Sequence, residues 1–538
     1  MKTIRRGIAA AAGLLLVASA CGGDDGAGDD VAAGTTQPNE VAEEVNKIDL
    51  GGTTSTTTGA SDTTTKAPAA YPSTMQEWEA LWEEERAAVV ERITENGWGL
   101  QADGKTVTGP EGFTIDLSQC AAGFSNTEGI TDTEIKIGSH TALSGTLADG
   151  GNIMRAGQVV MDHYNKAGFF QDSEGKKRSV NLIIKDDGYD PARTIPIVDE
   201  LLDSEKVFAV WGLGSGPVMK TYDKLNQRCV PHPFEITGHP AWGDPVNHPW
   251  TTGILLAYNT EATLWGAFID QHIDELTAGD GKATIAGLIM NNDFGKAYEI
   301  GFKAWLATTP NKDKIEFVSE TIEPQAPTVT DPMTNLAAKR PDMFIQMLAG
   351  TPCAQTITEV AQNGMKEETK FLMAASVCRA STYTGRDAVG DASEGWWIMG
   401  GGARDVASPA EDDTAYIVWA RELLASGGYD YKSSGNLGFG VGFGWMWVQV
   451  LEIAGQLPGG LTRANLITAV RATEMTAPMY LEGIKWNMNG NADAYWLEGT
   501  EVGRYDVAKQ TFVQQGDIID LSGKSSNCAW DQSSATCR

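Results

Sequence analysis

Positive charge is scarce in this sequence. The 538 residues include 41 lysines and arginines against 71 aspartates and glutamates, which gives a net charge of −30 at pH 7. Such a surface repels the phosphate backbone of nucleic acids, so we expect no nucleic-acid partner. A chain of this length exceeds one ordinary hydrophobic core, and at least two lobes are expected.

Histidine is also rare, with six residues in the chain. Three of them, His232, His239 and His248, each precede a proline within one short segment. Proline favours extended and turn backbone, so these histidines are typical of structural loops rather than of a metal site. The glycine-rich run 438–444 lacks the strand and the ribose-binding acid of a dinucleotide fingerprint. We therefore expect neither a metal nor a cofactor.

Beyond the N-terminus we find no charge-free apolar run of transmembrane length, so membrane attachment is expected there alone. Residues 1–20 combine Lys2, Arg5 and Arg6 with a short apolar run and a small-residue end, the pattern of a secretory signal peptide. Cys21 follows directly, as in the bacterial lipoproteins that this segment resembles, and we expect its thiol to carry a lipid. The alternative is an ordinary signal peptide with a chance cysteine.

Residues 21–70 contain few aromatic or branched apolar side chains and many threonines, glycines, serines and aspartates. Such a segment cannot offset the entropy of ordering, so we expect a flexible tether. The exported protein would then be held through Cys21 on the outer face of the cytoplasmic membrane.

Six cysteines remain after Cys21, namely Cys120, Cys229, Cys353, Cys378, Cys528 and Cys537. An even number in an exported protein predicts three disulfides. Six cysteines allow fifteen pairings, and their number alone does not choose among them.

The segment 71–126 is expected to form a small N-terminal module. Apolar residues at helical spacing predict a helix over 75–93, capped by Ser73 or Thr74. Two turn signals between residues 98 and 120 predict a hairpin-like piece. The module is either a packing element or a docking surface.

From Thr131 onward, short apolar strands alternate with helices. The first series has expected strands at 135–138, 180–185, 207–211 and 229–234, and the second, after Glu261, at 284–290, 315–319, 343–348 and 370–374. This alternation is typical of doubly wound parallel sheets, and two series predict two α/β lobes. A later helix is expected over 445–454.

A set of short motifs follows in order between about residues 130 and 520: Ile135-Lys-Ile-Gly138, Leu143-Ser-Gly145, Asp186-Asp187, Val207-Phe-Ala-Val-Trp-Gly212, Val230-Pro231, Asn292-Asp-Phe-Gly295, Gly390-Asp-Ala-Ser-Glu-Gly395 and Lys485-Trp-Asn-Met-Asn-Gly490. Together they resemble the type I periplasmic binding proteins of the branched-chain amino acid (Leu/Ile/Val-binding) kind. These are the solute receptors of ABC importers.

The resemblance implies two lobes that close on a ligand by a hinge motion, in the manner of a Venus flytrap. Carried over to this chain, lobe 1 comprises residues 127–256 and 402–475. Lobe 2 comprises residues 257–401 and 476–520, and residues 521–538 form a tail.

Ligands of parallel sheets lie beyond the carboxyl ends of the strands, and this rule selects three loops of lobe 1. Glycines there let backbone N–H groups approach a ligand, and a helix N-terminus favours an anion. The resemblance implies that these loops grip the ligand's carboxylate, and the expected ligand-binding residues are Ser144, Gly214, Ser215, Gly216, Glu235 and Thr237. The alternative for Ser215 is a helix cap alone.

In lobe 2 the same rule selects Phe294, Thr351, Ser376 and Arg379. Phe294 occupies a position where the family often packs an aromatic ring on the ligand, and its alternative role is in the core. We expect these four residues to contact the ligand from the second lobe.

Arg379 departs from the pattern of the amino-acid binders that the chain resembles. Those proteins carry an acidic residue in the loop aligned with 376–379, where it pairs the ligand's ammonium group. An unpaired cation beside an ammonium group would be unfavourable in a closed cleft. The ligand is therefore expected to be a carboxylic acid, an amide or another small polar metabolite, unless Glu235 or Asp293 supplies the missing charge.

The expected sheet order favours one set of disulfides. Cys353 and Cys378 follow strands expected to be neighbours, within reach of a disulfide. Cys528 and Cys537 are close in sequence and would staple the tail. Cys120 and Cys229 then remain, and Cys229, at the start of its expected strand, would pin the N-terminal module to the back of lobe 1.

We therefore expect a solute-binding lipoprotein that delivers a small polar metabolite, such as an amino acid, amide or carboxylic acid, to the permease subunits of an ABC importer. The alternative is a ligand-sensing lipoprotein of the same fold that signals to a membrane partner. A secreted hydrolase is disfavoured, since no nucleophile elbow surrounds Ser215 and no histidine is placed as its base. No enzyme activity is expected.

Overall fold

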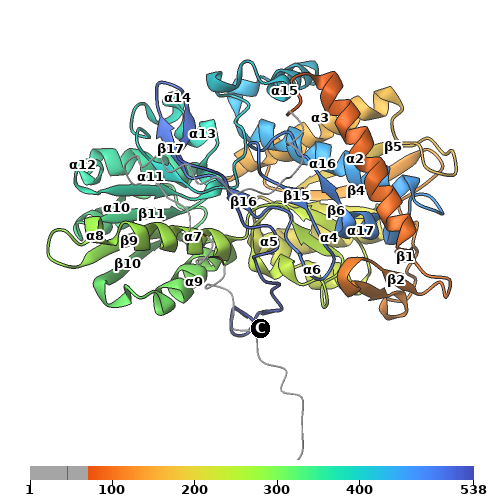
Figure 1. The fold of residues 1–538 in the computed structure, drawn as a ribbon, viewed down its shortest axis with the longest axis horizontal. Helices are drawn as coiled ribbons and strands as arrows, with labels where there is room; N and C mark the ends of the chain where they lie inside the picture. The colour runs from red at the N-terminus through yellow and green to blue at the C-terminus, as the bar shows by residue number, and fades with distance from the viewer. Residues whose placement is uncertain (1–40, 42–44, 46–70) are drawn as a thin grey trace, which may run out of the picture. The chain divides into compact units, whose positions relative to one another are not determined.

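Two sheets, each at the centre of one α/β lobe, organise the chain (Figure 1). The computed structural model describes residues 41, 45 and 71–538. The predicted signal segment 1–20 and the predicted lipid site Cys21 lie outside the described residues, as does most of the predicted tether.

Two residues within the predicted tether are packed. Val41 and Val45 are buried, and the carbonyl oxygen of Val45 accepts a hydrogen bond from Gln271 Nε2 at 3.3 Å. Gln271 is the last residue of helix α7 (Tyr258–Gln271). At these two positions the chain therefore contacts the folded part.

The sheet of the first lobe is parallel. Its strand order is β5, β4, β6, β7, β8, with bounds Ser179–Asp186, Glu134–Thr141, Ala209–Gly212, His232–Glu235 and Thr251–Gly253. Two hydrogen bonds of 2.9 Å, from Val210 N to Pro231 O and from Ile236 N to Gly212 O, connect β6 to β7. The carboxyl ends of these strands therefore meet at one edge.

Helices cover both faces of this sheet. On one face, α4 (Pro191–Asp203) and α6 (Tyr222–Gln227) pack on Val210 of β6. On the other face, the ring of Trp211 lies 6.0 Å from that of Trp447 in α16 (Asn436–Gln456). Successive residues of a strand point to opposite faces of the sheet, so Val210 contacts the helices on one face and Trp211 contacts the helix on the other. This is the predicted doubly wound arrangement.

The second lobe contains a seven-stranded sheet. Its order is β10, β9, β11, β12, β13, β17, β18, with bounds Ile315–Ile322, Ala283–Met290, Met343–Met347, Phe371–Ala374, Trp397–Ile398, Gly503–Asp506 and Thr511–Gln514. The first five strands are parallel to one another. Strand β17 pairs antiparallel with β13, and β18 pairs antiparallel with β17. Its helices include α7, α9 (Asp293–Thr308), α10 (Thr330–Ala337) and α11 (Thr351–Gln362).

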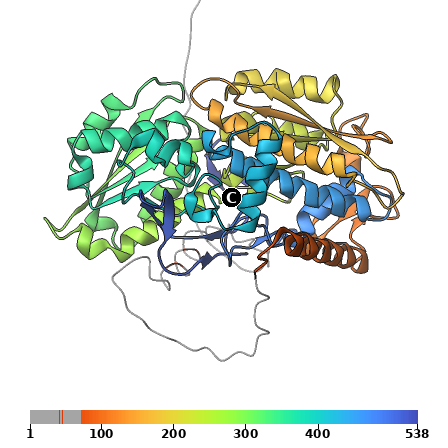
Figure 2. The same ribbon diagram turned by 90° about the horizontal axis from the view of Figure 1, so that it is seen from above.

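The predicted fold, two α/β lobes with parallel sheets, is confirmed, and Figure 2 shows the lobes side by side. Several local expectations need correction. The segment after β6 forms two short helices, α5 (Ser215–Met219) and α6. Cys229 precedes β7 instead of opening it, because it lies in a turn with a φ of 52° after α6.

Helix α16 differs most from the prediction. It begins at Asn436, so the glycine run 438–444 lies inside the helix and not before it. It is also long and apolar enough to cross a membrane, contrary to our expectation of no such segment, but 83% of that stretch is buried within the protein. A buried core helix has the same composition as a membrane span.

The glycines of α16 permit close packing on α3 (Gly151–Ala167). A Cβ atom on Gly440 would overlap the carbonyl oxygen of Ile153, and one on Gly444 would lie 2.8 Å from the Cα atom of Gly157. The two backbones therefore approach each other directly. This tertiary contact offsets the poor helix propensity of glycine.

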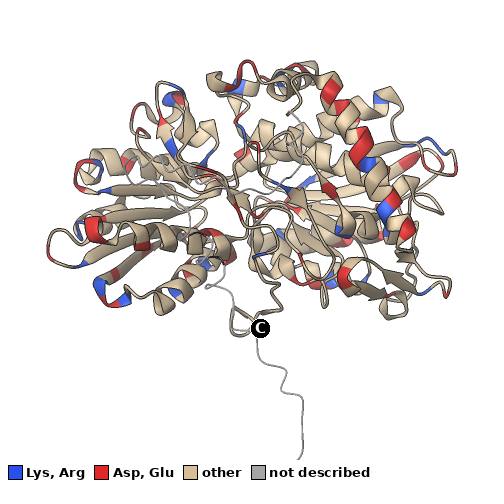
Figure 3. Cartoon of the chain, viewed as in Figure 1, with Lys and Arg blue, Asp and Glu red and all other residues tan. Residues whose placement is uncertain are grey.

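The N-terminal module packs on lobe 1. Helix α2 (Met75–Glu95) begins with a capping box formed by Thr74 and Glu77, and β1 (Gly99–Leu100), β2 (Thr106–Thr108) and β3 (Thr114–Asp116) form an antiparallel sheet. The ring of Trp82 lies 4.9 Å from that of Trp445 in α16. Acidic side chains recur along α2 and over both lobes (Figure 3). Exposed ion pairs contribute little to stability, so apolar contacts such as that of Trp82 with Trp445 contribute more to holding the module on lobe 1.

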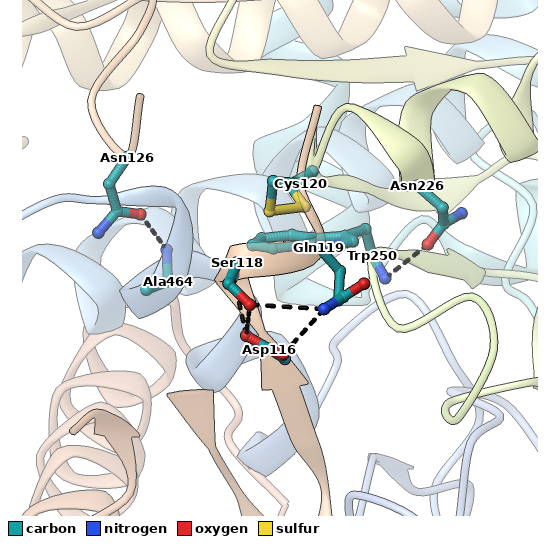
Figure 4. The surroundings of a disulfide bond; sticks show 9 residues. Asp116, Ser118, Gln119, Cys120, Asn126, Asn226, Trp250 and Ala464 are labelled. Atoms are coloured by element: carbon teal, nitrogen blue, oxygen red, sulfur yellow. Dashed lines mark hydrogen bonds between the residues drawn. A yellow bond between two sulfur atoms is a disulfide. The ribbon is translucent and has the colours of Figure 1, made fainter. Parts of the chain in front are cut away.

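The three expected disulfides, Cys120–Cys229, Cys353–Cys378 and Cys528–Cys537, are present. The first joins the module to lobe 1, and beside it Asp116 accepts hydrogen bonds from Ser118 and Gln119 (Figure 4). The third closes the terminal hairpin of β20 (Trp530–Asp531) and β21 (Thr536–Cys537).

We predict that Gly440→Ala destabilises the protein by more than about 1 kcal/mol, since the new methyl group would force α16 away from α3. Gly455→Ala is the matched control, because its Cβ would meet nothing closer than 3.6 Å. That substitution should stabilise the helix by up to about 1 kcal/mol. Urea denaturation of both variants checks this, and equal effects would contradict the packing argument.

Candidate ligand-binding cleft

A cavity of about 120 Å³ lies between the lobes. Its lining includes thirteen apolar residues, namely Leu147, Ile153, Leu213, Ile236, Leu255, Leu256, Phe294, Ala349, Val377, Ala403, Phe439, Phe443 and Leu497. Four tyrosines also contribute, namely Tyr189, Tyr258, Tyr383 and Tyr480, together with Ser376, Arg379, Asn436 and four glycines. An apolar cavity of about 150 Å³ holds benzene, so this somewhat smaller one can enclose only a small ligand.

Tyr189 covers the lobe 1 loop that was expected to bind an anion. A Cβ atom on Gly214 would overlap the ring of Tyr189, so this ring packs directly on the loop. Ser215 Oγ lies 2.7 Å from Thr237 Oγ1, and Ser215 is fully buried. Gly214 lines the cavity, whereas Ser215, Gly216 and Thr237 do not. The hydroxyls of Ser215 and Thr237 therefore satisfy each other.

Ser144 and Thr351 lie at the rim instead of in the cavity. Ser144 Oγ donates to Asp186 Oδ2 at 2.8 Å. Thr351 Oγ1 donates to the carbonyl oxygen of Thr146 at 2.9 Å, and Thr146 Oγ1 donates to that of Pro324 at 2.6 Å. These last two contacts join the lobes, so Thr351 helps to hold them together across the opening.

Glu235 lies behind the cavity. Its side chain is buried without a hydrogen-bond partner, and burial raises the pKa of its carboxyl well above the usual range. A Cβ atom on Gly212 would overlap both Glu235 Oε2 and His140 Nε2, so these atoms lie directly against the backbone there. Glu235 is therefore not placed to supply a charge to the ligand.

Phe294, Ser376 and Arg379 line the cavity from the second lobe. The ring of Phe294 lies 5.1 Å from that of Tyr258 and 5.4 Å from that of Tyr298, so it serves both the core and the cavity wall. The Cys353–Cys378 disulfide links the first turn of α11 to the loop that carries Ser376 and Arg379. This bridge anchors the loop.

Arg379 is not the unpaired cation that the sequence suggested. Its Nη2 atom lies 2.8 Å from Glu501 Oε1, and its Nη1 atom donates to the carbonyl oxygen of Gly400 at 3.1 Å. The side chains of Arg379 and Glu501 are 8% and 1% exposed. Arg379 is paired, so it does not by itself exclude a ligand ammonium group from the cavity.

Glu261 is a second carboxyl that the sequence did not reveal. From the first turn of α7 it accepts hydrogen bonds from Ser376 N (2.6 Å), Ser376 Oγ (2.7 Å) and Tyr298 Oη (2.6 Å). Burial outweighs these bonds and raises its pKa to about 8. Glu261 thus positions Ser376 at the cavity wall. In the sequence, the position of Glu261 in the first turn of an expected helix was the one feature that could have drawn attention to it.

Two further polar groups face the cavity. The hydroxyl of Tyr480 has no hydrogen-bond partner, and the residue is 2% exposed. Asn436 Nδ2 donates to Asp149 Oδ2 at 2.8 Å and to the hydroxyl of Tyr383 at 3.2 Å. The asparagine is therefore satisfied by protein groups, whereas the tyrosine is available to a ligand.

The two lobes, the interlobe cavity and the contacts across its rim describe a receptor that encloses a small molecule. Residues 134–497 match the family described as "Periplasmic binding protein". The chain belongs to this family. No curated protein matches it.

Solved structures agree with this periplasmic binding protein fold. A fatty acid ABC transporter substrate-binding protein from Thermomonospora curvata is 19% identical, with a TM-score of 0.58, over 78% of this chain and 98% of that one. A branched-chain amino acid ABC transporter protein from Thermus thermophilus with bound valine is 15% identical, with a TM-score of 0.59, over 72% and 97%. A solute-binding protein from Rhodopseudomonas palustris HaA2, in complex with p-hydroxybenzoic acid, is 15% identical, with a TM-score of 0.58, over 73% and 98%.

We predict that Glu261 makes the stability of this periplasmic binding protein depend on pH. Between its usual pKa of 4.5 and about 8, the folded state keeps a proton that the unfolded chain releases. The free energy of unfolding should therefore fall as pH rises through this window, by at most about 1.4 kcal/mol per pH unit from this group. Glu261→Gln should lack that contribution.

Urea denaturation at pH 5, 6.5 and 8 measures the two slopes. Glu275→Gln, at an exposed position, is the control and should keep the wild-type slope. Parallel slopes for wild type and Glu261→Gln would show that Glu261 ionises normally in the folded protein.

Proposed function

We propose that this chain is the extracytoplasmic solute-binding protein of an ABC importer and has no catalytic role of its own. The observation that carries the proposal is the cavity between the two lobes, closed by hydrogen bonds across its rim from Thr146 to Thr351 and Pro324. Opening and reclosing of these contacts would let a ligand enter and would present a closed form to the permease subunits.

The cavity changes the class of ligand that we propose. From the sequence we expected a small polar metabolite, but thirteen residues of the described lining are apolar. Arg379 is the one residue of that lining with a full charge. A strongly polar ligand would lose its hydration without gaining enough hydrogen bonds. A small molecule with an apolar body and one polar group fits better.

The named ligands of the structural relatives span this range. One is a fatty acid ABC transporter protein, one holds bound valine, and one is in complex with p-hydroxybenzoic acid. The last has an apolar ring, which is the kind of body that the cavity favours. Branched-chain amino acids carry two charged groups, for which this lining offers little compensation.

The position beside the membrane is part of the same proposal. A lipid on Cys21 would keep the receptor near its permease subunits, and residues between it and the described fold would span the distance. Val41 and Val45 contact the folded part, so the free length of this connection is shorter than the full segment 21–70.

We predict that Leu213→Trp abolishes ligand retention, because the larger side chain would fill the cavity. Ala349→Leu is a milder second variant at another point of the wall. Val246→Trp, at a residue that is 68% exposed, is the control and should bind normally. Native mass spectrometry of the purified proteins compares the small molecule that each one retains.

The proposal fails if Leu213→Trp and Ala349→Leu, both folded, retain the same molecule at the same occupancy as wild type. Uptake of that labelled molecule by cells with and without the chain then separates transport from sensing, since a sensor would leave uptake unchanged.

A further inference from the structure

The positive charge in the cavity lining, on Arg379, already has a partner within the protein. Arg379 is the one residue of the lining that carries a full charge, and Glu501 lies 2.8 Å from its guanidinium group. Both side chains are almost completely buried, so little water screens the pair. The guanidinium group also donates to the carbonyl oxygen of Gly400. Its positive charge is therefore committed before any ligand arrives.

The other ionisable groups near the cavity are carboxyls. Glu261 lies behind Ser376, and Asp149 lies beside Asn436. Asp405 interacts electrostatically with Arg379 and accepts hydrogen bonds from Ser381 N and Ala407 N. Among the residues that the structure describes, no lysine and no second arginine line the cavity. A ligand anion would face this set with no uncommitted cation.

Several hydrogen-bonding groups of the lobe 1 loop are already used by protein partners. The hydroxyls of Ser215 and Thr237 bond to each other at 2.7 Å. The Gly214 N–H donates to the carbonyl oxygen of Ile236. The Gly214 N–H and one hydroxyl of the Ser215–Thr237 pair are therefore committed to protein acceptors.

One donor remains without a partner at the cavity wall. The Tyr480 hydroxyl is buried, has no hydrogen-bond partner and belongs to the same lining as Arg379 and Ser376. Tyr480 also feels the charge of Arg379, which lowers the pKa of its hydroxyl against the larger effect of burial. A hydrogen-bond acceptor on the ligand would satisfy this group.

We propose that the cavity selects an uncharged, largely apolar ligand whose hydrogen-bond acceptor binds at Tyr480 and Arg379, because Glu501 neutralises the one cation of the lining. This inference rests on the proposed function and names its ligand class. Either a carboxylate or a cation would bring an additional, unpaired charge into this buried site. Among the classes expected from the sequence, the amide meets this condition and the free acid does not.

Three probes of one shape test the inference: benzamide, benzoate and benzamidine carry charges of zero, minus one and plus one at pH 7. We expect calorimetric titration of the ligand-free protein to show benzamide binding at least tenfold tighter than either charged probe. Benzoate or benzamidine binding as tightly as benzamide would overturn the inference. So would binding of none of the three.

Glu501→Gln separates the charge from the shape of the site. With Arg379 left unpaired, the preference should shift toward benzoate by at least tenfold relative to benzamide. The double variant Arg379→Gln/Glu501→Gln removes both charges, so it should prefer benzamide again, and it guards against misfolding of the single variant. Glu482→Gln removes the same charge from an exposed position and should leave the ratio unchanged. An unaltered ratio in folded Glu501→Gln would contradict the role of Glu501.

The molecule that copurifies with the wild-type protein provides a second test. An uncharged compound supports the inference, and a carboxylate or ammonium compound refutes it. In the second case the proposed function would still stand, since a ligand would have been captured. Absence of any retained or bound molecule would count against the proposed function itself.

Discussion

The ion pair between Arg379 and Glu501 decides what the cleft can bind. It joins a loop of the second lobe to the segment that leads into β17, and it leaves the guanidinium group without spare charge. Because the pair is buried, removal of either partner would leave an uncompensated charge in a dry site. The rest of the cavity can therefore be apolar, with hydrogen bonding confined to a few groups such as Ser376 and the Tyr480 hydroxyl.

The walls of that cavity depend on backbone packing in the first lobe. Phe439 and Phe443 line it from α16, and Ile153 lines it from α3. The glycines between them let the two helices approach until backbone meets backbone, as at Gly440 and Ile153. The packing that stabilises the lobe therefore also sets the position of the aromatic wall.

Much of the fold could be predicted from the sequence because alternation of strand and helix is a local pattern. The strand expected over 180–185 is β5, and the helix expected over 75–93 is α2, with the predicted cap at Thr74. The start of α16 could not be predicted, because glycine disfavours a helix locally and only the contact with α3 offsets that cost. The candidate site was predicted in part, since Phe294, Ser376 and Arg379 line the cavity.

By itself, the sequence determined the two α/β lobes, the ends of the strands near the cleft and the sulfur pairs that neighbouring elements bring together. Only the tertiary structure decided which polar groups remain available there. Ser215 lies after its strand as expected, yet its hydroxyl is hydrogen-bonded to that of Thr237. Glu261 and Glu501 come from distant segments to Ser376 and Arg379. Burial and charge act through distances in space, which spacing along the chain does not encode.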